Sequence, residues 1–372
     1  MRNVVVIDGA HLKGKYGGCL LTASCQDGNY QLFPIAFGIV DGENDNAWIW
    51  FFRKLIEVIP DRHDLVFVSD RHNTRVYPMA QHCACVVHLQ RNIQAIFKKR
   101  PLNYMVSKAA RAFLQSDFYD HFEEIHETDE GCASYLTAIG YEHWARSHFP
   151  GVCYNIMTSN VAESLNNVLL GARDHPIVPL IECIRATLMC WFATRREDAN
   201  SCGTTLTPKM EELLAKNFEM STGFAYHKIN AGEHEIRNKE GVPYMVNLET
   251  QTCSCQEFQM LRYPCSHAVV AAIRSNTRVD SLVVAEYTKA FWIKAYECNI
   301  YPVTATAPIE TVGDDFSGLN LLPPRTRPPP GRPRKTRIRS CGEIGLGQPK
   351  RFTVCGRCGG FGHNRATCKM PI

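Results

Sequence analysis

The sequence lacks the features of an exported or membrane-embedded protein. Its first apolar run, Val4–Ile7, reaches a charged residue after four positions, which is too short for the apolar core of a signal peptide. No uninterrupted apolar run approaches the roughly 20 residues that a membrane-spanning helix requires. We therefore expect a protein that is neither secreted nor bound to a membrane.

Cysteine is too sparse for a disulfide scaffold, and the net charge is too small to indicate nucleic acid by itself. The 372 residues include 17 cysteines, 41 Lys and Arg and 37 Asp and Glu, for a net charge of +4. Grouped Cys and His are then expected to bind metal in a reducing compartment rather than to cross-link. With 45% hydrophobic residues, the chain has enough apolar material for two or three domains.

Residues 1–200 have the pattern of an α/β domain. Strand patterns cover 4–7, 20–25, 31–40 and 65–68, and a helical pattern follows the third of them at 44–58. Residues from about 89 to 150 are helical in pattern throughout, which predicts a helical insertion in this domain. We expect a mixed sheet covered by helices.

The strongest motif is a Cys/His cluster near the C-terminus, formed by Cys355, Cys358, His363 and Cys368. Three thiolates and one imidazole suit a closed tetrahedral Zn²⁺ site, and the glycines between the ligands let so short a backbone wrap the ion. The spacing resembles that of the CCHC zinc knuckle, a family that binds single-stranded nucleic acid.

A second cluster consists of Cys253, Cys255, Cys265 and His267. Cys-x-Cys places two ligands on a strand and turn, and Cys-x-His opens a helix, so the four can converge on one ion. Buried structural cysteines are the alternative. The pattern resembles the SWIM zinc finger, which implies a second structural Zn²⁺ and a protein- or DNA-interaction module.

Carboxylates follow two of the predicted strands. Asp8 ends the first strand and Asp70 follows the fourth, and a third acid, Glu163, lies in the first turns of a later helix, with Glu182 as its nearest substitute. Neighbouring carboxylates repel unless cations neutralise them. Such a trio can hold two Mg²⁺ or Mn²⁺ ions about 4 Å apart; alternatively, the strand-terminal acids only form turns.

Three blocks of sequence, at 7–18, 68–72 and 158–166, resemble the catalytic blocks of Mutator-like (MuDR-type, MULE) plant transposases. The resemblance runs in register from about residue 4 to 200. It implies a ribonuclease H-like fold and a catalytic DDE trio at Asp8, Asp70 and Glu163. The family also carries a Cys-x2-His pair, filled here by Cys85 and His88, for which simple packing is an equal alternative.

Two departures from this family stand out. The first block has Ala10 where the family usually has Thr. The chain also begins a few residues before Asp8, whereas family members carry a long N-terminal region with DNA-binding elements. We therefore expect a truncated element copy, a partial gene model or a domesticated derivative.

Residues 302–350 form a basic linker rich in Pro and Arg, with no acid between positions 323 and 339. The segment around Arg332, Arg334 and Lys335 resembles an AT-hook, which lies in the minor groove of A·T tracts. A nuclear-localisation patch is an equal alternative, and both predict a nuclear protein that meets DNA.

These patterns combine into one prediction. A ribonuclease H-like domain (1–200) precedes a SWIM-type finger (224–280), the linker and a knuckle (351–372). The expected activity is DNA cleavage and strand transfer by two Mg²⁺ or Mn²⁺ ions, in the nucleus, with two structural Zn²⁺ ions and with homo-oligomerisation left open. The alternative is a domesticated, catalytically silent DNA-binding regulator or a truncated transposon remnant.

Overall fold

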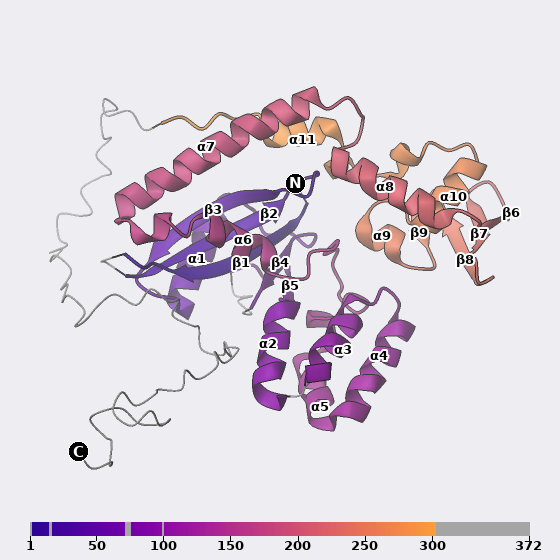
Figure 1. Ribbon diagram of the computed structural model, residues 1–372, viewed down its shortest axis with the longest axis horizontal. Coiled ribbons are helices and arrows are strands. Elements are labelled where there is room, and N and C mark those ends of the chain that lie inside the picture. Colours follow the sequence, from indigo (N-terminus) through magenta and orange to yellow (C-terminus); the bar gives the residue numbers. More distant parts are fainter. Residues whose placement is uncertain (1, 15–16, 71–75, 99, 303–372) are drawn as a thin grey trace, which may run out of the picture. The chain divides into compact units, whose positions relative to one another are not determined.

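The computed structural model describes residues 2–14, 17–70, 76–98 and 100–302 (Figure 1). Within them the chain forms a five-stranded sheet and a separate four-stranded sheet. The predicted knuckle ligands and the linker residues lie outside the described residues, namely Cys355, Cys358, His363, Cys368, Arg332, Arg334 and Lys335.

The larger sheet is mixed, and its strand order is β3-β2-β1-β4-β5. Strand β2 is antiparallel to both of its neighbours, while β4 is parallel to both of its own. The prediction of an α/β protein with a mixed sheet is confirmed, although the last strand was not predicted. The strands are β1 (Val4–His11), β2 (Cys19–Gln26), β3 (Leu32–Val40), β4 (Val66–Ser69) and β5 (Gln81–Ala84).

Asp8 does not end its strand, contrary to the prediction. Antiparallel pairing with β2 carries β1 onward to His11, whereas the parallel pairing with β4 stops at Val6 opposite Val68. Asp8 therefore lies in the middle of β1, two residues beyond Val6, where the pairing of β1 with β4 ends. Asp70 lies the same number of residues beyond Val68, so the register places the two acids at one level of the sheet.

Different helices cover the two faces of the sheet (Figure 1). Val5 and Ile7 of β1 pack with the aromatic side chains of α1, whereas Val4 and Val6 belong to the core on the opposite side. Because side chains alternate along a strand, Asp8 lies on the same face as Val4 and Val6. That face also contacts α6. The helices are α1 (Asp45–Leu55) and α6 (Asn160–Val168).

The predicted helical insertion begins directly after β5. Apolar side chains at helical spacing, such as Leu89 and Ile93 in the first helix and Leu102 and Val106 in the second, are buried in one shared core. The insertion consists of α2 (Val86–Phe97), α3 (Arg100–Arg111), α4 (Gln115–Thr128), α5 (Glu130–Ile139) and the 3-10 helix η1 (Tyr141–His143).

Helix α7 (Ile177–Ser201) is long and apolar enough to cross a membrane by length and composition alone, unlike any run identified in the sequence. Leu180 and Ile184 pack with Leu20 of β2 and Leu165 of α6. The length test is weak support for a membrane span, because helices of soluble cores also satisfy it. A short 3-10 helix, η2 (Ala172–Asp174), precedes α7.

The smaller sheet is antiparallel, with the order β6-β7-β8-β9. Its core contains three cysteines of the second cluster together with apolar residues of α10. The elements of this region are α8 (Pro208–Ser221), β6 (Ala225–Lys228), β7 (Glu233–Arg237), β8 (Pro243–Asn247), β9 (Thr252–Cys253), α9 (Glu257–Leu261), α10 (Ser266–Arg274), η3 (Val279–Leu282), η4 (Ala285–Tyr287) and α11 (Lys289–Ala295).

The buried carboxylate of Asp27 links the turn between β2 and β3 to Trp292 and Tyr296, near the C-terminal end of the described residues. Trp292 Nε1 and Tyr296 Oη donate to Asp27 Oδ2 at 3.0 and 2.8 Å. The backbone N–H groups of Asn29 and Gln31 donate to Oδ1 at 2.9 and 2.8 Å. Burial raises the pKa of Asp27. Four donors satisfy this carboxylate, so we assign it a structural role.

Candidate metal centres

The second Cys/His cluster is closed and buried. The ligand atoms of Cys253, Cys255, Cys265 and His267 all lie within 4.8 Å of one another, and all four residues are buried. Within the described part of the chain, this is the one group of three or more Cys, His, Asp or Glu residues gathered closely enough to share an ion. Three sulfurs and one imidazole are the donor set of a structural zinc site.

The local structure positions three of these ligands. Cys253 ends β9, and Gln259 of α9 clamps its backbone by accepting from its N–H and donating to its carbonyl, both at 3.0 Å. Cys265 is the N-cap of α10, where the helix dipole favours a thiolate. The His267 ring stacks on Tyr244, with centroids 3.9 Å apart.

The electrostatics of the cluster also suit a cation. Contacts with the thiols of Cys255 and Cys265 lower the pKa of Cys253 to about 4. Burial raises the pKa of the Cys265 thiol. A divalent cation would stabilise the thiolates that burial alone disfavours.

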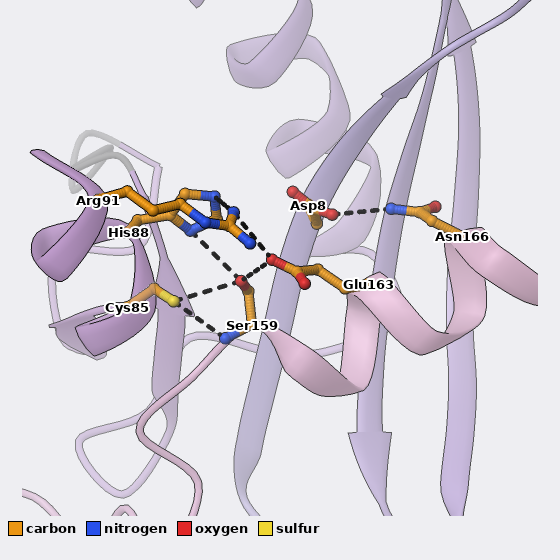
Figure 2. A network of polar contacts seen from close by, with 7 residues as sticks. All are labelled: Asp8, Cys85, His88, Arg91, Ser159, Glu163 and Asn166. Carbon is orange, nitrogen blue, oxygen red and sulfur yellow. Dashed lines mark hydrogen bonds and ion pairs between the residues drawn. The ribbon is translucent and has the colours of Figure 1, made fainter. Parts of the chain in front are cut away.

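The acid site starts with Asp8 on β1. Asn166 of α6 donates from Nδ2 to Asp8 Oδ2 at 2.8 Å (Figure 2). The pKa of Asp8 is raised to about 7, mainly by burial; the charge of His88 and the hydrogen bond from Asn166 lower it, whereas the charges of Asp70 and Glu163 raise it. The amide oxygen Oδ1 of Asn166 is buried and has no hydrogen-bond partner within the described structure.

Glu163 projects from α6 toward Asp8, while its own contacts reach the helical insertion (Figure 2). Its Oε1 accepts from Arg91 Nη1 of α2 at 3.3 Å and from Ser159 Oγ at 3.4 Å. The side chain of Glu163 is 31% exposed, so this ion pair is partly open to solvent. This carboxylate therefore connects α6 to the helical insertion.

The structure brings together the three acids predicted from sequence. Asp70 directly follows β4 and is exposed, whereas Asp8 lies on β1 and Glu163 on α6. Both other acids act electrostatically on Asp8. Their oxygens are less tightly gathered than the ligand atoms of the cysteine cluster. Glu182, the substitute considered in sequence, is exposed and pairs with Arg185.

Cys85 and His88 connect to the acid site through Ser159. Cys85 Sγ lies 3.3 Å from Ser159 Oγ and accepts from the Ser159 N–H at 3.1 Å, and His88 Nδ1 lies 3.3 Å from the same hydroxyl (Figure 2). Hydrogen bonding with Cys85 raises the pKa of His88. Burial acts against ionisation of Cys85, but hydrogen bonds with His88 and Ser159 outweigh it and lower the pKa of this thiol.

Sequence reasoning missed the contacts that Arg91, Asn166 and Ser159 make at this site. Ser159 is the N-cap residue of α6, as its residue type predicts, yet its side chain makes no capping hydrogen bond. The hydroxyl instead contacts Cys85, His88 and Glu163. An Asn within the first turns of a helix could have indicated a partner for the strand acid, because Asn166 follows Glu163 by three residues and shares its side of the helix.

Fold and clusters together define a zinc-binding α/β protein with an additional acidic centre. The family model described as MULE transposase domain matches residues 4–92, and the model described as SWIM zinc finger matches residues 241–276. The resemblance to Mutator-like transposases with a SWIM finger is thereby confirmed for these segments. The chain is transposase-derived and zinc-binding, and both domains associate it with nucleic acid in general. No curated protein matches the sequence.

Proposed function

We propose that this protein is a nuclear, Mutator-like transposase-derived enzyme that cleaves and joins DNA at the acid site. The observation that carries the proposal is the convergence of Asp8, Asp70 and Glu163 from three separate elements: burial is the main cause of the raised pKa of Asp8, and the charges of the other two acids act in the same direction. Outside a metal site, three such acids would be destabilising.

The residues present fit divalent cations. Asp8 and Asp70 offer carboxylates at one level of a ribonuclease H-like sheet, and Glu163 offers a third from α6. The unpartnered Oδ1 of Asn166 adds a neutral oxygen next to Asp8. Hard oxygen donors of this kind are the ligands that Mg²⁺ and Mn²⁺ prefer.

Each residue has a defined role in this proposal. Asp8 and Asp70 hold the ions, and Glu163 completes the shell of the second one. Bound ions of this kind activate water or a 3′-hydroxyl and stabilise the leaving oxygen of a phosphodiester. Asn166 orients Asp8, and Arg91 orients Glu163 while adding positive charge where a phosphate would bind.

The proposed zinc content is two ions per chain. The first belongs to the SWIM-type cluster, and the second to Cys355, Cys358, His363 and Cys368, by the spacing of a CCHC knuckle. We further propose that the knuckle binds single-stranded nucleic acid and that Arg332, Arg334 and Lys335 contact DNA. Deleting residues 325–339 should flatten the salt dependence of DNA affinity.

One observation favours the alternative of a catalytically silent DNA-binding regulator. Arg91 already neutralises Glu163 through an ion pair at 3.3 Å. In a silent protein this pair would persist with Mn²⁺ present, and no cation would be retained. The two functions therefore differ in whether Mn²⁺ binds to the acid site.

The test is DNA nicking and joining by the purified protein with Mn²⁺. We expect activity in the wild type, and its loss in Asp70→Asn because one ion would lose its carboxylate. Asp120→Asn, an equal change at an exposed position of α4, is the matched control and should retain activity. Equal activity of the wild type and Asp70→Asn would reject the enzymatic function.

A further inference from the structure

Charge is sharply divided between the two halves of the helical insertion. No acid occurs between Val86 and Ser116, where the sequence carries three arginines and three lysines. The next stretch, from Asp117 through Ala145, carries eight acids and neither lysine nor arginine. The division falls between α3 and α4, so one pair of helices is basic and the next pair is acidic.

The basic side chains of α2, of its C-cap residue and of α3 lie on the outward sides of the two helices. Leu89 and Val106 point into the common core, and Gln90 donates to the backbone carbonyl of Asn103 at 2.6 Å where the two helices meet. With one side of each helix in the core and another against its neighbour, helical periodicity leaves the basic positions on the solvent side. We call these residues the basic face: Arg91, Lys98, Tyr104, Lys108 and Arg111.

Exposure agrees with this arrangement. Arg91, Lys98 and Arg111 are exposed, and none of the five is buried. Tyr104 is 67% exposed, which is unusual for so large a ring. The Nζ atom of Lys108 lies 4.8 Å from the centre of that ring. An exposed aromatic ring beside a cation suits a nucleic acid, whose bases stack and whose phosphates are anionic.

The basic face begins at the acid site. Arg91 belongs to this face and also bonds to Glu163 at 3.3 Å (Figure 2). At the usual rise per residue, helix α2 extends about 10 Å from Arg91 to its C-cap residue Lys98. The basic face therefore continues about this distance from the acid site. B-DNA presents a charge about every 1.7 Å along its axis, so this length spans several phosphates.

We propose that the basic face is the track on which the phosphate backbone of DNA runs toward the acid site. This inference rests on the proposed function, since it specifies how that site receives its substrate. The acidic helix α4, which packs beside α3, borders the track and repels DNA that strays from it. The competing occupant is the acidic helix pair of a second copy of this chain.

The experiment measures the binding of a fluorescent DNA duplex to the full-length protein across a salt series, without Mg²⁺ or Mn²⁺. The test variant is Lys108→Gln/Arg111→Gln, in the last turn of α3. The matched control is Arg53→Gln/Lys54→Gln, in the last turn of α1 on the opposite face of the sheet. The single variant Lys98→Gln tests the same face in the event that the double variant does not fold.

We expect the test variant to bind DNA about tenfold more weakly than wild type, with a salt slope smaller by about two, because each phosphate contact contributes about 0.9. Lys98→Gln should reduce the slope by about one, and the control should match wild type. Wild-type affinity and slope in both basic-face variants would overturn the inference. So would unchanged DNA binding combined with loss of a dimer, which would identify a second copy as the occupant.

The result separates this inference from the proposed function, because binding is measured without the ions that chemistry needs. If wild type cleaves DNA with Mn²⁺ but the basic-face variants bind normally, only the track is wrong. If wild type does not cleave DNA yet the variants bind more weakly than the control, the track stands and the chemistry is wrong.

Discussion

The zinc cluster and the proposed acid site of this protein are built in opposite ways. In the SWIM-type cluster four ligands from adjacent segments lie within 4.8 Å of one another, and all are buried. In the acid site three carboxylates come from β1, the end of β4 and α6, with Asp70 exposed and Glu163 partly so. One centre is closed to solvent, whereas the other remains open.

This difference fits the roles that we propose for the two sites. A structural zinc site uses all its coordination positions on protein ligands, and its binding energy becomes folding energy. A catalytic site must leave positions for substrate and water. The cysteine cluster should therefore control stability, and the acid site should be unfavourable for stability until cations bind.

The largest effect should follow from removing one ligand of the cysteine cluster. Cys265→Ser removes a ligand at the start of α10 and should lower the zinc content by one ion per chain while unfolding the region of β6 to β9, because that core is built around the cluster. Elemental analysis and limited proteolysis measure both effects. Cys298→Ser, at an exposed cysteine, is the control and should change neither. Retention of zinc by Cys265→Ser would contradict the site.

A smaller effect on stability, of the opposite sign, is expected when Asp8 of the acid site is replaced by Asn. The pKa of Asp8 is raised to about 7 by burial and by the neighbouring acids. The metal-free folded state therefore loses stability as pH rises from about 4 to 7, where the unfolded chain ionises this group freely and the folded one does not. Asp8→Asn avoids that loss.

In thermal unfolding with EDTA, at a concentration that leaves zinc bound, we expect Asp8→Asn to be more stable than wild type by about 4 kcal/mol at pH 8. The difference should disappear below about pH 4, where Asp8 is protonated in both states. Adding Mn²⁺ should stabilise the wild type and leave the variant unchanged. A variant less stable than wild type at pH 8 would show that Asp8 is not under electrostatic strain.

The sequence predicted those parts of the fold whose signals are local. The strand patterns at 20–25 and 31–40 form β2 and β3, and the helical pattern at 44–58 forms α1, which Asn44 caps by accepting from the N–H of Ala47 at 3.0 Å. The zinc ligands near residue 260 were also predicted, because their spacing along the chain already limits the geometry. Short-range chemistry was sufficient in each case.

Features that depend on distant partners were missed. Strand β5 has only four residues, with His82 and Cys83 in place of β-branched side chains, and pairing with β4 supplies its conformation. Asp8 was placed at a strand end because nothing local shows that β2 continues to pair with β1 as far as His11. The contacts of Ser159 were missed for a similar reason, since its partner Cys85 lies 74 residues away.

Replacing Ser159 should give the smallest effect on stability. It also tests directly how the acid site is organised. Its hydroxyl contacts Cys85, His88 and Glu163 but caps no helix, so Ser159→Ala should leave α6 intact while loosening Glu163. Losing a hydrogen bond of about 1 kcal/mol should raise the Mn²⁺ concentration needed for half-maximal thermal stabilisation about fivefold.

A purely structural Ser159 would lower the melting temperature equally with and without Mn²⁺. A positioning residue changes the Mn²⁺ dependence instead, and Ser159→Thr, which keeps the hydroxyl, should restore it. Ser201→Ala, at an exposed position at the end of α7, is the control for loss of a hydroxyl. An unchanged Mn²⁺ midpoint in Ser159→Ala would mean that Arg91 alone positions Glu163, because their ion pair does not involve the serine.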